Sequence, residues 1–334
     1  MKKLLTLILS AVLFLVAVFA VGCADEPEQG KINIKYYKDG QAVVQSILGG
    51  SETIGLVPEP AATALERNAA KQGKTIYRLD LQELYDSADK AYPQAVLMVK
   101  KSVLGANANL ISDLENKISN SVSWVKSNAA DAVAAIGNHG TTTLQAGALS
   151  ESAIDGCKIY WQGAASAKSS VKTYIDKIVE IDNTKATAVK DDFFYTQVES
   201  SAVKEEYTFI TPDGAPALAV AKLLNDGDDL GTGKKVSYSV VSATQISPSL
   251  AGGTADFIIA PVNLASKLYK ASGEDHYVMV AVLTHGNFYI MSTEDLSLKD
   301  MAGKQVAVPN MGAVPDWTFK MVLSKHGLDF VTVE

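Results

Sequence analysis

Four loops in this sequence combine a proline with small and polar residues, at points where a short apolar run gives way to a helical pattern. The clearest is residues 305–319, QVAVPNMGAVPDWTF, in which Val306 and Val308 indicate a strand. Pro315 then fits the first turn of a helix, where its missing N–H costs nothing. Such a loop presents backbone N–H groups at a helix N-terminus, beyond the carboxyl end of a strand. We interpret it as a seat for a small ligand.

The same order of strand, proline loop and helix recurs three more times, in residues 210–224, 258–270 and 56–70. Ordinary connectors in an α/β fold would explain any one of these loops. Four of them together predict a set of βα units whose strand ends meet at one edge of a sheet, where ligands of open α/β proteins bind.

The bulk composition limits the class of protein. A chain of 334 residues with 47% hydrophobic content can bury a large core and has room for two lobes. The net charge of −7 argues against nucleic acid as a partner. Arg67 and Arg78 are the only arginines, and neither lies in the four loops, so arginine clamps on phosphate or carboxylate are not expected there.

The first residues are predicted to be an export signal. Lys2 and Lys3 precede an apolar run over residues 4–21, and small residues lead up to Cys23. The ending resembles a bacterial lipoprotein signal, which implies lipidation of Cys23, a signal peptide of residues 1–23 and a tether of residues 24–30. A plain transmembrane anchor is the alternative. Either way the globular part is expected outside the cytoplasmic membrane, and Cys157 is left as a buried free thiol.

The order of the elements carries the domain prediction. Residues 32–79 read as alternating strands and helices, residues 94–100 as a strand, and residues 107–126 as an amphipathic helix. Strand and helix alternate again from Tyr207, after a connector over residues 182–204. The chain ends on residues 330–333, a strand with no helix after it.

Four segments resemble the solute-binding lipoproteins of bacterial ABC importers, in the nitrate, sulfonate, taurine and thiamine-precursor group. They are YTFITPDGAPALA (207–219), TADFIIAPVNLASKL (254–268), KDMAGKQVAVPNMGAVPD (299–316) and YYKDGQAVVQSILGGSETIGLVPEPAATAL (36–65). The resemblance covers nearly all of residues 31–195 and 204–334. It implies the α/β type II periplasmic-binding-protein fold: two lobes with mixed, mostly parallel sheets, joined by hinge strands around a ligand cleft.

The segments occur in a different order from that family, in which the segment like 207–219 comes first. We interpret the chain as a circular permutant whose usual termini are joined through residues 196–204. Residues 31–93 and 293–334 would then form a discontinuous lobe, and residues 94–292 a continuous one. Hinge crossings are expected near residues 93–95 and 291–293. The final strand, 330–333, should lie in the same sheet as residues 32–37.

In such a fold the four loops would line the cleft. The ligand-binding residues predicted from the continuous lobe are Thr211, Asp213, Gly214, Ala215, Pro261, Asn263, His285 and Asn287. Those predicted from the other lobe are Glu59, Asn310, Met311, Gly312 and Ala313. Gly214, Gly312 and Ala313 would offer backbone N–H groups, and the asparagines could donate or accept hydrogen bonds.

The charges near these loops bear on the ligand. Asp213, Glu59 and Asp316 lie in or beside them, which favours an amino-bearing or neutral heterocycle over sulfonate or nitrate. Each of the three carboxylates could instead cap a helix N-terminus. Trp317 could stack on a flat ligand, although core packing is the usual role of such a residue.

No catalytic, cofactor or metal motif stands out. The four histidines are far apart in sequence, and no GxSxG elbow or P-loop occurs. The leading hypothesis is therefore a monomeric, non-enzymatic receptor, lipid-anchored on the extracytoplasmic face, that captures a small solute by hinge closure and delivers it to ABC permease subunits. An enzyme of thiamine-pyrimidine synthesis on the same fold, or a solute sensor, is the alternative; the export signal argues against the enzyme.

Overall fold

The computed structural model describes residues 30–86, 88–105, 109–196 and 204–333. The predicted signal peptide, its lipidation residue Cys23, all of the tether but Gly30, and most of the linker over 196–204 lie outside these ranges. Within them, no helix has both the length and the apolar character needed to cross a bilayer.

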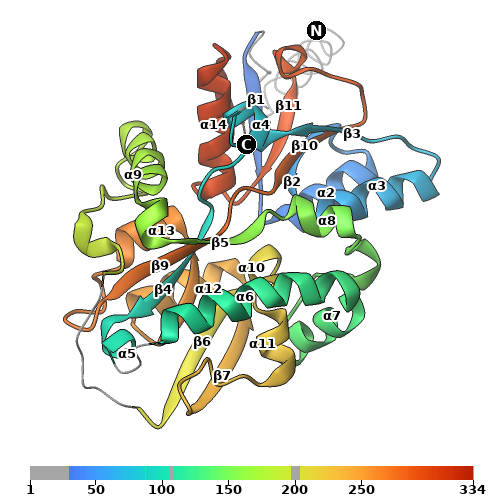
Figure 1. Cartoon of the computed structure of the whole chain (residues 1–334). Coiled ribbons are helices and arrows are strands. Elements are labelled where there is room, and N and C mark those ends of the chain that lie inside the picture. Colours follow the sequence, from blue (N-terminus) through green and yellow to red (C-terminus); the bar gives the residue numbers. More distant parts are fainter. Residues whose placement is uncertain (1–29, 87, 106–108, 197–203, 334) are drawn as a thin grey trace, which may run out of the picture.

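The strands form two separate sheets of six strands each (Figure 1). The first sheet has the order β12-β1-β11-β2-β10-β3. Its strands are β1 (Ile32–Tyr37), β2 (Ile54–Pro58), β3 (Tyr77–Asp80), β10 (Phe288–Ser292), β11 (Gln305–Pro309) and β12 (Phe330–Val333). We call this sheet and its helices the first lobe.

The second sheet has the order β5-β9-β4-β8-β6-β7. Its strands are β4 (Ala95–Lys100), β5 (Ile159–Gly163), β6 (Glu206–Pro212), β7 (Lys235–Val241), β8 (Phe257–Pro261) and β9 (Tyr277–Thr284). This sheet and its helices form the second lobe. The α/β architecture with two lobes, expected from the sequence, is confirmed.

Helices cover both faces of each sheet. In the first lobe, α2 (Gly40–Gly49) and α3 (Ala61–Lys71) pack on one face, and α4 (Leu81–Tyr85) and α14 (Val314–Lys325) on the other, with η3 (Leu298–Met301) beside them. In the second lobe, one face carries α5 (Lys101–Gly105), α6 (Leu110–Ser127), α7 (Ala129–Asn138), η1 (Ala146–Ala148), α8 (Glu151–Gly156), α10 (Ala215–Leu218) and α11 (Ala221–Asp226). The other carries α9 (Ala164–Ile181), η2 (Asp191–Phe193), α12 (Ala243–Ala251) and α13 (Val262–Leu268).

Local signals explain where several of these helices begin and end. Asp39 accepts a hydrogen bond from Ala42 N and caps α2, which ends at Gly50 in the left-handed region. Ser150 caps α8 in the same way, and Ser242 and Gln245 form a capping box at α12. Residues close in sequence therefore determine where these helices begin and end.

The chain passes between the lobes twice. It leaves the first lobe after α4 and enters the second at β4, close to the crossing predicted near residues 93–95. It returns between Thr284 at the end of β9 and Phe288 at the start of β10. The crossing predicted near residues 291–293 occurs earlier in the structure, because Phe288–Ser292 already pairs with β2 and β3 of the first sheet.

Parallel and antiparallel pairs are equally common among the described strands, with five of each, so neither sheet is as dominated by parallel pairs as expected. The crossings account for most of the difference. β10 arrives from the second lobe and runs antiparallel to both of its neighbours, as β4 does in the second sheet. A strand that enters a sheet from the other lobe runs against the βα units already there.

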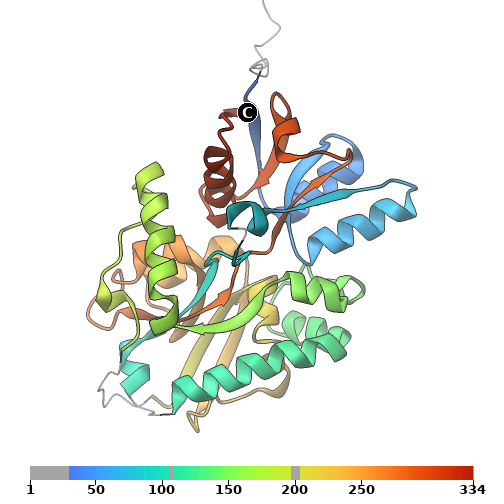
Figure 2. The ribbon, with the colours of Figure 1, turned by 45° about the horizontal axis from the view of Figure 1, so that its top comes forward.

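The two ends of the described chain lie side by side. β12 pairs with β1 in parallel, with Ile32 opposite Phe330 and Lys35 opposite Val333, and Figure 2 shows the C-terminus beside the first strand. The prediction that these segments share a sheet is confirmed.

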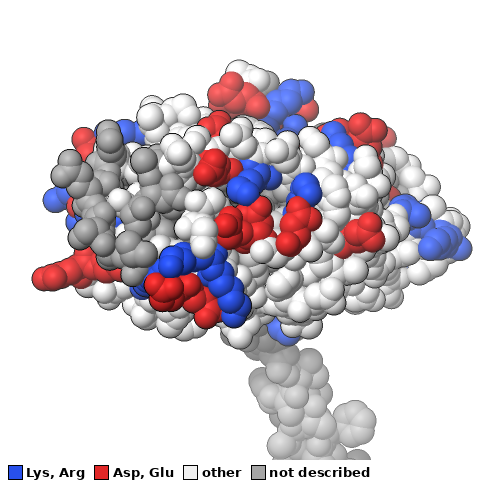
Figure 3. Space-filling view, turned by 60° about the horizontal axis from the view of Figure 1, so that its bottom comes forward, with Lys and Arg blue, Asp and Glu red and all other residues white. Residues whose placement is uncertain are grey.

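The surface at the lower end of the second lobe mixes charges of both signs (Figure 3). Ion pairs between strands β6 and β7, such as Lys235 with Glu206 at 2.9 Å, are typical of the second lobe's surface. Among the described residues of the face in view, no stripe of basic side chains forms a track for a nucleic-acid backbone.

Candidate functional site

Three of the four loops singled out by the sequence come together where the two lobes touch. We call this contact region the seam, and define it by the residues that bridge it or flank a crossing: Glu59, Gln94, Gly156, Tyr174, Asn263, Asn287, Gly312 and Thr318. The loops after β2 and β11 reach it from the first lobe, and the loop after β8 reaches it from the second. The strand ends are thus brought to one place, as expected for ligand-binding α/β proteins.

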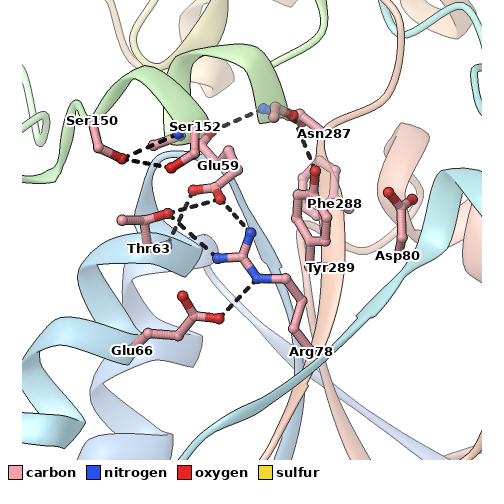
Figure 4. Close-up of polar contacts among 12 residues, drawn as sticks. Glu59, Thr63, Glu66, Arg78, Asp80, Ser150, Ser152, Asn287, Phe288 and Tyr289 are labelled. Carbon is pink, nitrogen blue, oxygen red and sulfur yellow. Dashed lines mark hydrogen bonds and ion pairs between the residues drawn. The ribbon is translucent and has the colours of Figure 1, made fainter.

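An ion pair between a buried carboxylate and a partly exposed arginine lies on the first-lobe side of the seam (Figure 4). The carboxylate of Glu59 is 1% exposed and accepts hydrogen bonds from Arg78 Nη1 at 2.6 Å, Thr63 Oγ1 at 2.9 Å and Thr63 N at 3.1 Å. The guanidinium of Arg78 also bonds Glu66 and lies 4.5 Å from the ring centre of Tyr289. Burial alone would lower the pKa of Arg78, but Glu59 and Glu66 raise it above its usual value.

The expectation that no arginine lies at these loops is therefore wrong. Arg78 is on β3, which pairs with β10, and β10 in turn pairs with β2, whose end carries Glu59. Sheet order brings the arginine to the loop, although it lies 19 positions further along the chain on another strand. Glu59 is left with no free charge to offer a ligand, and its bond to Thr63 N supports the alternative role at the start of α3.

Amide side chains extend this hydrogen-bond network to the crossing between the lobes. Asn287 Nδ2 donates to the backbone oxygen of Glu59, and Asn287 Oδ1 accepts from Gln94 Nε2, both at 2.9 Å. The backbone N–H of Glu59 donates to Asn287 O at 2.8 Å. Asn287 is thus a predicted site residue that the structure places in the seam, where it links the end of β2 to the start of β4.

Asn263 bridges the lobes directly. Its Nδ2 donates to Gly312 O of the first lobe at 3.4 Å and to Lys185 O of the second at 3.3 Å. The side chain is 5% exposed. Pro261, two residues earlier, is half-buried at the end of β8. Of the predicted residues, Asn263 and Gly312 are in direct contact across the seam, as are Asn287 and Glu59 beside the second crossing.

The loop after β11 does not present free N–H groups as expected. Gly312 N donates to Asp316 Oδ2 at 2.9 Å, and Ala313 N donates to Asn310 O at 3.0 Å. The Asp316 carboxylate is fully buried in the first turn of α14 and bonds Gly312 N just before the helix, so an anion seat there is already filled by the protein's own side chain. Met311 at the loop tip is 69% exposed, away from the buried contacts.

The corner after β6 is likewise satisfied from within the second lobe. Asp213 accepts from Thr142 Oγ1 at 2.7 Å, and from the backbone N–H and hydroxyl of Thr143 at 2.7 and 2.8 Å. Gly214 has φ of 98°, a conformation that favours glycine, and Thr211 and Ala215 on either side are buried. These predicted residues form a tight turn, and Asp213 bonds Thr142 and Thr143 of its own lobe.

His285 is buried beside the second crossing. Its ring stacks on Tyr160 with centroids 3.5 Å apart, and its ring nitrogens lie 3.4 Å from Lys158 O and 3.3 Å from Gln162 Oε1. Burial lowers the pKa of His285 from 6.5 to about 4. A histidine in this setting is neutral near pH 7 and serves the packing of the crossing.

This shift predicts a pH dependence of stability. Between pH 6.5 and about 4 the unfolded chain takes up a proton at His285 that the folded protein does not, so stability is full above pH 6.5 and falls as the pH drops towards 4. The loss amounts to at most about 3 kcal/mol from this group. Urea unfolding over this pH range should show the slope. This dependence of the unfolding free energy on pH should be weaker in His285→Gln and unchanged in His326→Gln, which alters an exposed histidine. An unchanged pH dependence in His285→Gln would show that His285 is not its source.

Tyr174 and Thr318, two residues of the seam, had no sequence signal. Tyr174 on α9 places its hydroxyl 2.6 Å from Thr318 Oγ1 on α14, and Trp317 Nε1 donates to Gly312 O at 2.9 Å. Trp317 packs in a cluster made mainly of second-lobe side chains, which is the core role given as the alternative to ligand stacking. Tyrosine and tryptophan at helical spacing look like core residues, and only their partners show that they bridge two lobes.

Gly156 at the end of α8 faces the Glu59 site closely. A Cβ added there would lie 3.0 Å from Glu59 Cγ and 3.1 Å from the hydroxyl of Tyr289. Glu59 is held by Arg78 and Thr63 and cannot retreat freely. Gly156→Ala is therefore expected to destabilise the fold by about 1–3 kcal/mol.

Gly137→Ala is the matched control, because Gly137 lies inside α7 and an added Cβ would meet nothing closer than 3.7 Å. This change should stabilise by about 0.5–1 kcal/mol through helix propensity. Urea titration of both variants measures the change in the free energy of unfolding, which should fall in Gly156→Ala and rise in Gly137→Ala. Equal stability of Gly156→Ala and the parent would show that α8 does not press on the first lobe.

Among the described residues, no group of three or more His, Cys, Asp or Glu side chains is arranged to hold a metal ion. Cys157 is a free thiol and fully buried, as predicted, and burial raises its pKa well above the usual value. A buried thiol with a raised pKa is not a reactive nucleophile.

The sequence matches no protein-family model, and no curated protein is significantly similar to it. Among solved structures, the chain is similar to NikA from Brucella suis in complex with Fe(III)-EDTA, at 9% identity, covering 80% of this chain and 58% of that one, with a TM-score of 0.32. It is also similar to NikA from Staphylococcus aureus in complex with Ni(L-His)2, at 10% identity, 80% and 59% coverage and a TM-score of 0.34.

A third similar structure is the oligopeptide-binding protein AppA from Bacillus subtilis in complex with a nonapeptide, at 10% identity, 79% and 57% coverage and a TM-score of 0.33. The chain thus spans less than three fifths of the length of these three proteins. At such low scores the comparison adds nothing to what the sheets and the seam themselves show.

Proposed function

We propose that the protein is an extracytoplasmic solute-binding protein of an ABC importer, anchored to the membrane through a lipid on Cys23. It captures a small solute between its two lobes by hinge closure and hands it to permease subunits. It acts as a monomer and carries out no chemical step on the solute.

One observation carries this proposal: loops from two separate sheets meet at a seam, and two crossings join the lobes within the described part of the chain. The chain passes between the lobes after α4 and again between β9 and β10. Domains joined in this way open and close about their crossings, and a ligand that contacts both sides stabilises the closed form. The Asn263 contact to Gly312 shows that side chain and loop from opposite lobes reach each other.

The resemblance of the four sequence segments to ABC-importer lipoproteins supports the same proposal, as does the export signal. The permuted order of the segments remains part of it. The parallel pairing of β12 with β1 favours this view, because it places the two ends of the described chain in one lobe. Chain ends at the surface of a lobe make such rewiring tolerable.

The test is to look for a bound solute without assuming its identity. Protein purified without added small molecules is unfolded, and the released compounds are identified by mass spectrometry. Thermal-shift measurements with amines, pyrimidines, sulfonates and nitrate follow, since a ligand at 100 times its Kd adds about 2.7 kcal/mol of stability. A released solute that raises Tm in a saturable manner is the expected result. Absence of both a released compound and any shift across the panel would refute the proposal.

A second measurement tests the anchor. Metabolic labelling with a fatty acid should mark the expressed protein, and Cys23→Ala should lose the label. An unlabelled parent protein would refute lipid anchoring while leaving solute capture to be judged by the first test.

A further inference from the structure

The two lobes touch on both sides of the crossings. Figures 1 and 2 show α9 beside α14 on one side, and α3 close to α8 on the other. On the first side Tyr174 of α9 contacts Thr318 of α14, and on the second Gly147 of η1 faces Arg67 of α3. We call these sides the α9–α14 flank and the α3–α8 flank. The crossings by themselves do not determine on which flank the lobes separate.

The α9–α14 flank has a hydrophobic core that both lobes share. Val314, Trp317 and Met321 of α14 are at most 8% exposed and belong to the same cluster as Tyr174 and Ile178 of α9. The other clusters formed by the described residues each consist of side chains from a single lobe. Separation at this flank would expose the shared core to water, with a free-energy cost that grows with the apolar area exposed.

Aromatic rings connect this core to the first crossing. Tyr92, which lies in the crossing, stacks on Tyr174 with ring centroids 5.8 Å apart, and Tyr85 of α4 meets the two rings edge-on at 5.5 and 5.9 Å. The hydroxyl of Tyr174 is 2.6 Å from Thr318 Oγ1, and both residues are at most 1% exposed. Such ring pairs stabilise a contact beyond the area they bury. The first crossing and the α9–α14 flank are therefore packed as one body.

The α3–α8 flank is held by much weaker contacts. The hydroxyl of Tyr289 donates to Gly156 O at 3.4 Å, a length at which a hydrogen bond is weak. Arg67 Nη1 lies 3.8 Å from where a Cβ of Gly147 would stand, and both residues are exposed. At both points the second lobe presents a glycine. Among the described residues, no hydrophobic cluster joins the lobes on this flank.

Separation at the α3–α8 flank also leaves no buried charge without its partner. Glu59, which lies next to Gly156, accepts its hydrogen bonds from Arg78 and Thr63, and all three residues belong to the first lobe. The groups that lose a partner are the hydroxyl of Tyr289 and the backbone oxygen of Gly156, and water can bond to both. Opening is therefore far less costly at this flank than at the other.

From this asymmetry we infer that the lobes separate on one side only: the α3–α8 flank opens and admits the solute, while the shared core of α9 and α14 stays closed as the pivot. This inference rests on the proposed function and deepens it by assigning the pivot and the side of entry. Motions of this kind leave a packed contact intact and break the contacts that bury least.

The experiment measures one distance across each flank with pairs of nitroxide spin labels on introduced cysteines. Ala70→Cys with Gln145→Cys spans the α3–α8 flank, and Thr173→Cys with Ser324→Cys spans the α9–α14 flank; all four positions are exposed. Cys23→Ala leaves Cys157 as the only native thiol, and its full burial should keep it unlabelled, which protein without introduced cysteines checks. Electron–electron double resonance is recorded after any bound solute has been released in urea and the protein refolded.

In ligand-free protein we expect two distances across the α3–α8 flank, one of them longer than in the structure, and a single distance across the α9–α14 flank. Gly156→Ala introduces a methyl group 3.0 Å from Glu59 Cγ and 3.1 Å from the hydroxyl of Tyr289, so it should wedge the first flank open. The ratio of the longer to the shorter distance should rise about fivefold or more in this variant. Gly137→Ala, the matched control inside α7, should leave the ratio unchanged.

Each other outcome overturns the inference. A longer distance across the α9–α14 flank alone would place the pivot on the wrong side. Longer distances across both flanks would show that the lobes move apart about the crossings, which leaves the hinge closure of the proposed function intact. Single distances across both flanks, in the parent and in folded Gly156→Ala alike, would refute hinge closure as well. Solute capture itself is judged separately, by the release of a bound compound.

Discussion

Trp317→Ala is expected to destabilise the protein by about 3–5 kcal/mol, as truncation of a buried aromatic side chain typically does. Trp317 is 4% exposed and packs in the cluster that joins α14 of the first lobe to α9 and α13 of the second. Its Nε1–H bond to Gly312 O is lost at the same time, which leaves that oxygen with only the long contact from Asn263. Urea unfolding gives the loss as a shift of the midpoint.

Trp124→Ala is the matched control, because Trp124 lies on α6 and is only partly buried. It should lose clearly less stability than Trp317→Ala. Similar losses in the two variants would contradict the view that α14 is held against the second lobe by Trp317. Solution scattering of the two variants also tests whether Trp317 holds the lobes together. If it does, Trp317→Ala should have a larger radius of gyration than Trp124→Ala.

Arg78→Met is expected to be the second large loss, about 3–5 kcal/mol, since removing one partner of a buried ion pair leaves the other charge uncompensated. Glu59 would keep only its two bonds from Thr63 and would lose the bond of 2.6 Å from Arg78. Methionine keeps most of the apolar stem that packs near Tyr289, so the loss reports mainly on the charge. Denaturant unfolding at pH 7 measures it.

Two companion variants sharpen this prediction. Glu66→Gln removes the more exposed partner of Arg78 and should change stability by less than about 1 kcal/mol. Arg78→Met combined with Glu59→Gln should recover part of the loss, because the buried charge is then gone. A double variant as unstable as Arg78→Met alone would show that the penalty comes from lost packing.

Much of the fold followed from local sequence signals. The proline loops predicted strand ends and helix starts, and β2, β6, β8 and β11 each end at such a loop in the structure. The unpaired strand at residues 330–333 predicted a partner near the start of the chain, and β1 is that partner. Periodicity and turn chemistry act over a few residues, which is why these features can be recognised without a structure.

The sheets themselves were predicted less well, for a physical reason. A strand that crosses between lobes has the same composition as one that stays, so nothing in Phe288–Ser292 shows that it pairs antiparallel with β2 in the first lobe. The direction of a strand within a sheet depends on where the chain comes from. That information is topological and is not carried by the residues of the strand.

What the sequence determined by itself is the set of elements, the loops that reach the seam, and the identity of Asn263, Asn287, Glu59 and Gly312 as residues of that region. Only the tertiary structure decided which of their polar groups remain free. Asn287 pairs with Gln94 and Asn263 donates to Gly312 O, while the oxygens of Asn263 and Gln94 are left without donors. Hydrogen-bond partners are chosen by atoms brought together from distant parts of the chain, so a residue's type tells what it can bond, and the fold alone decides what it does bond.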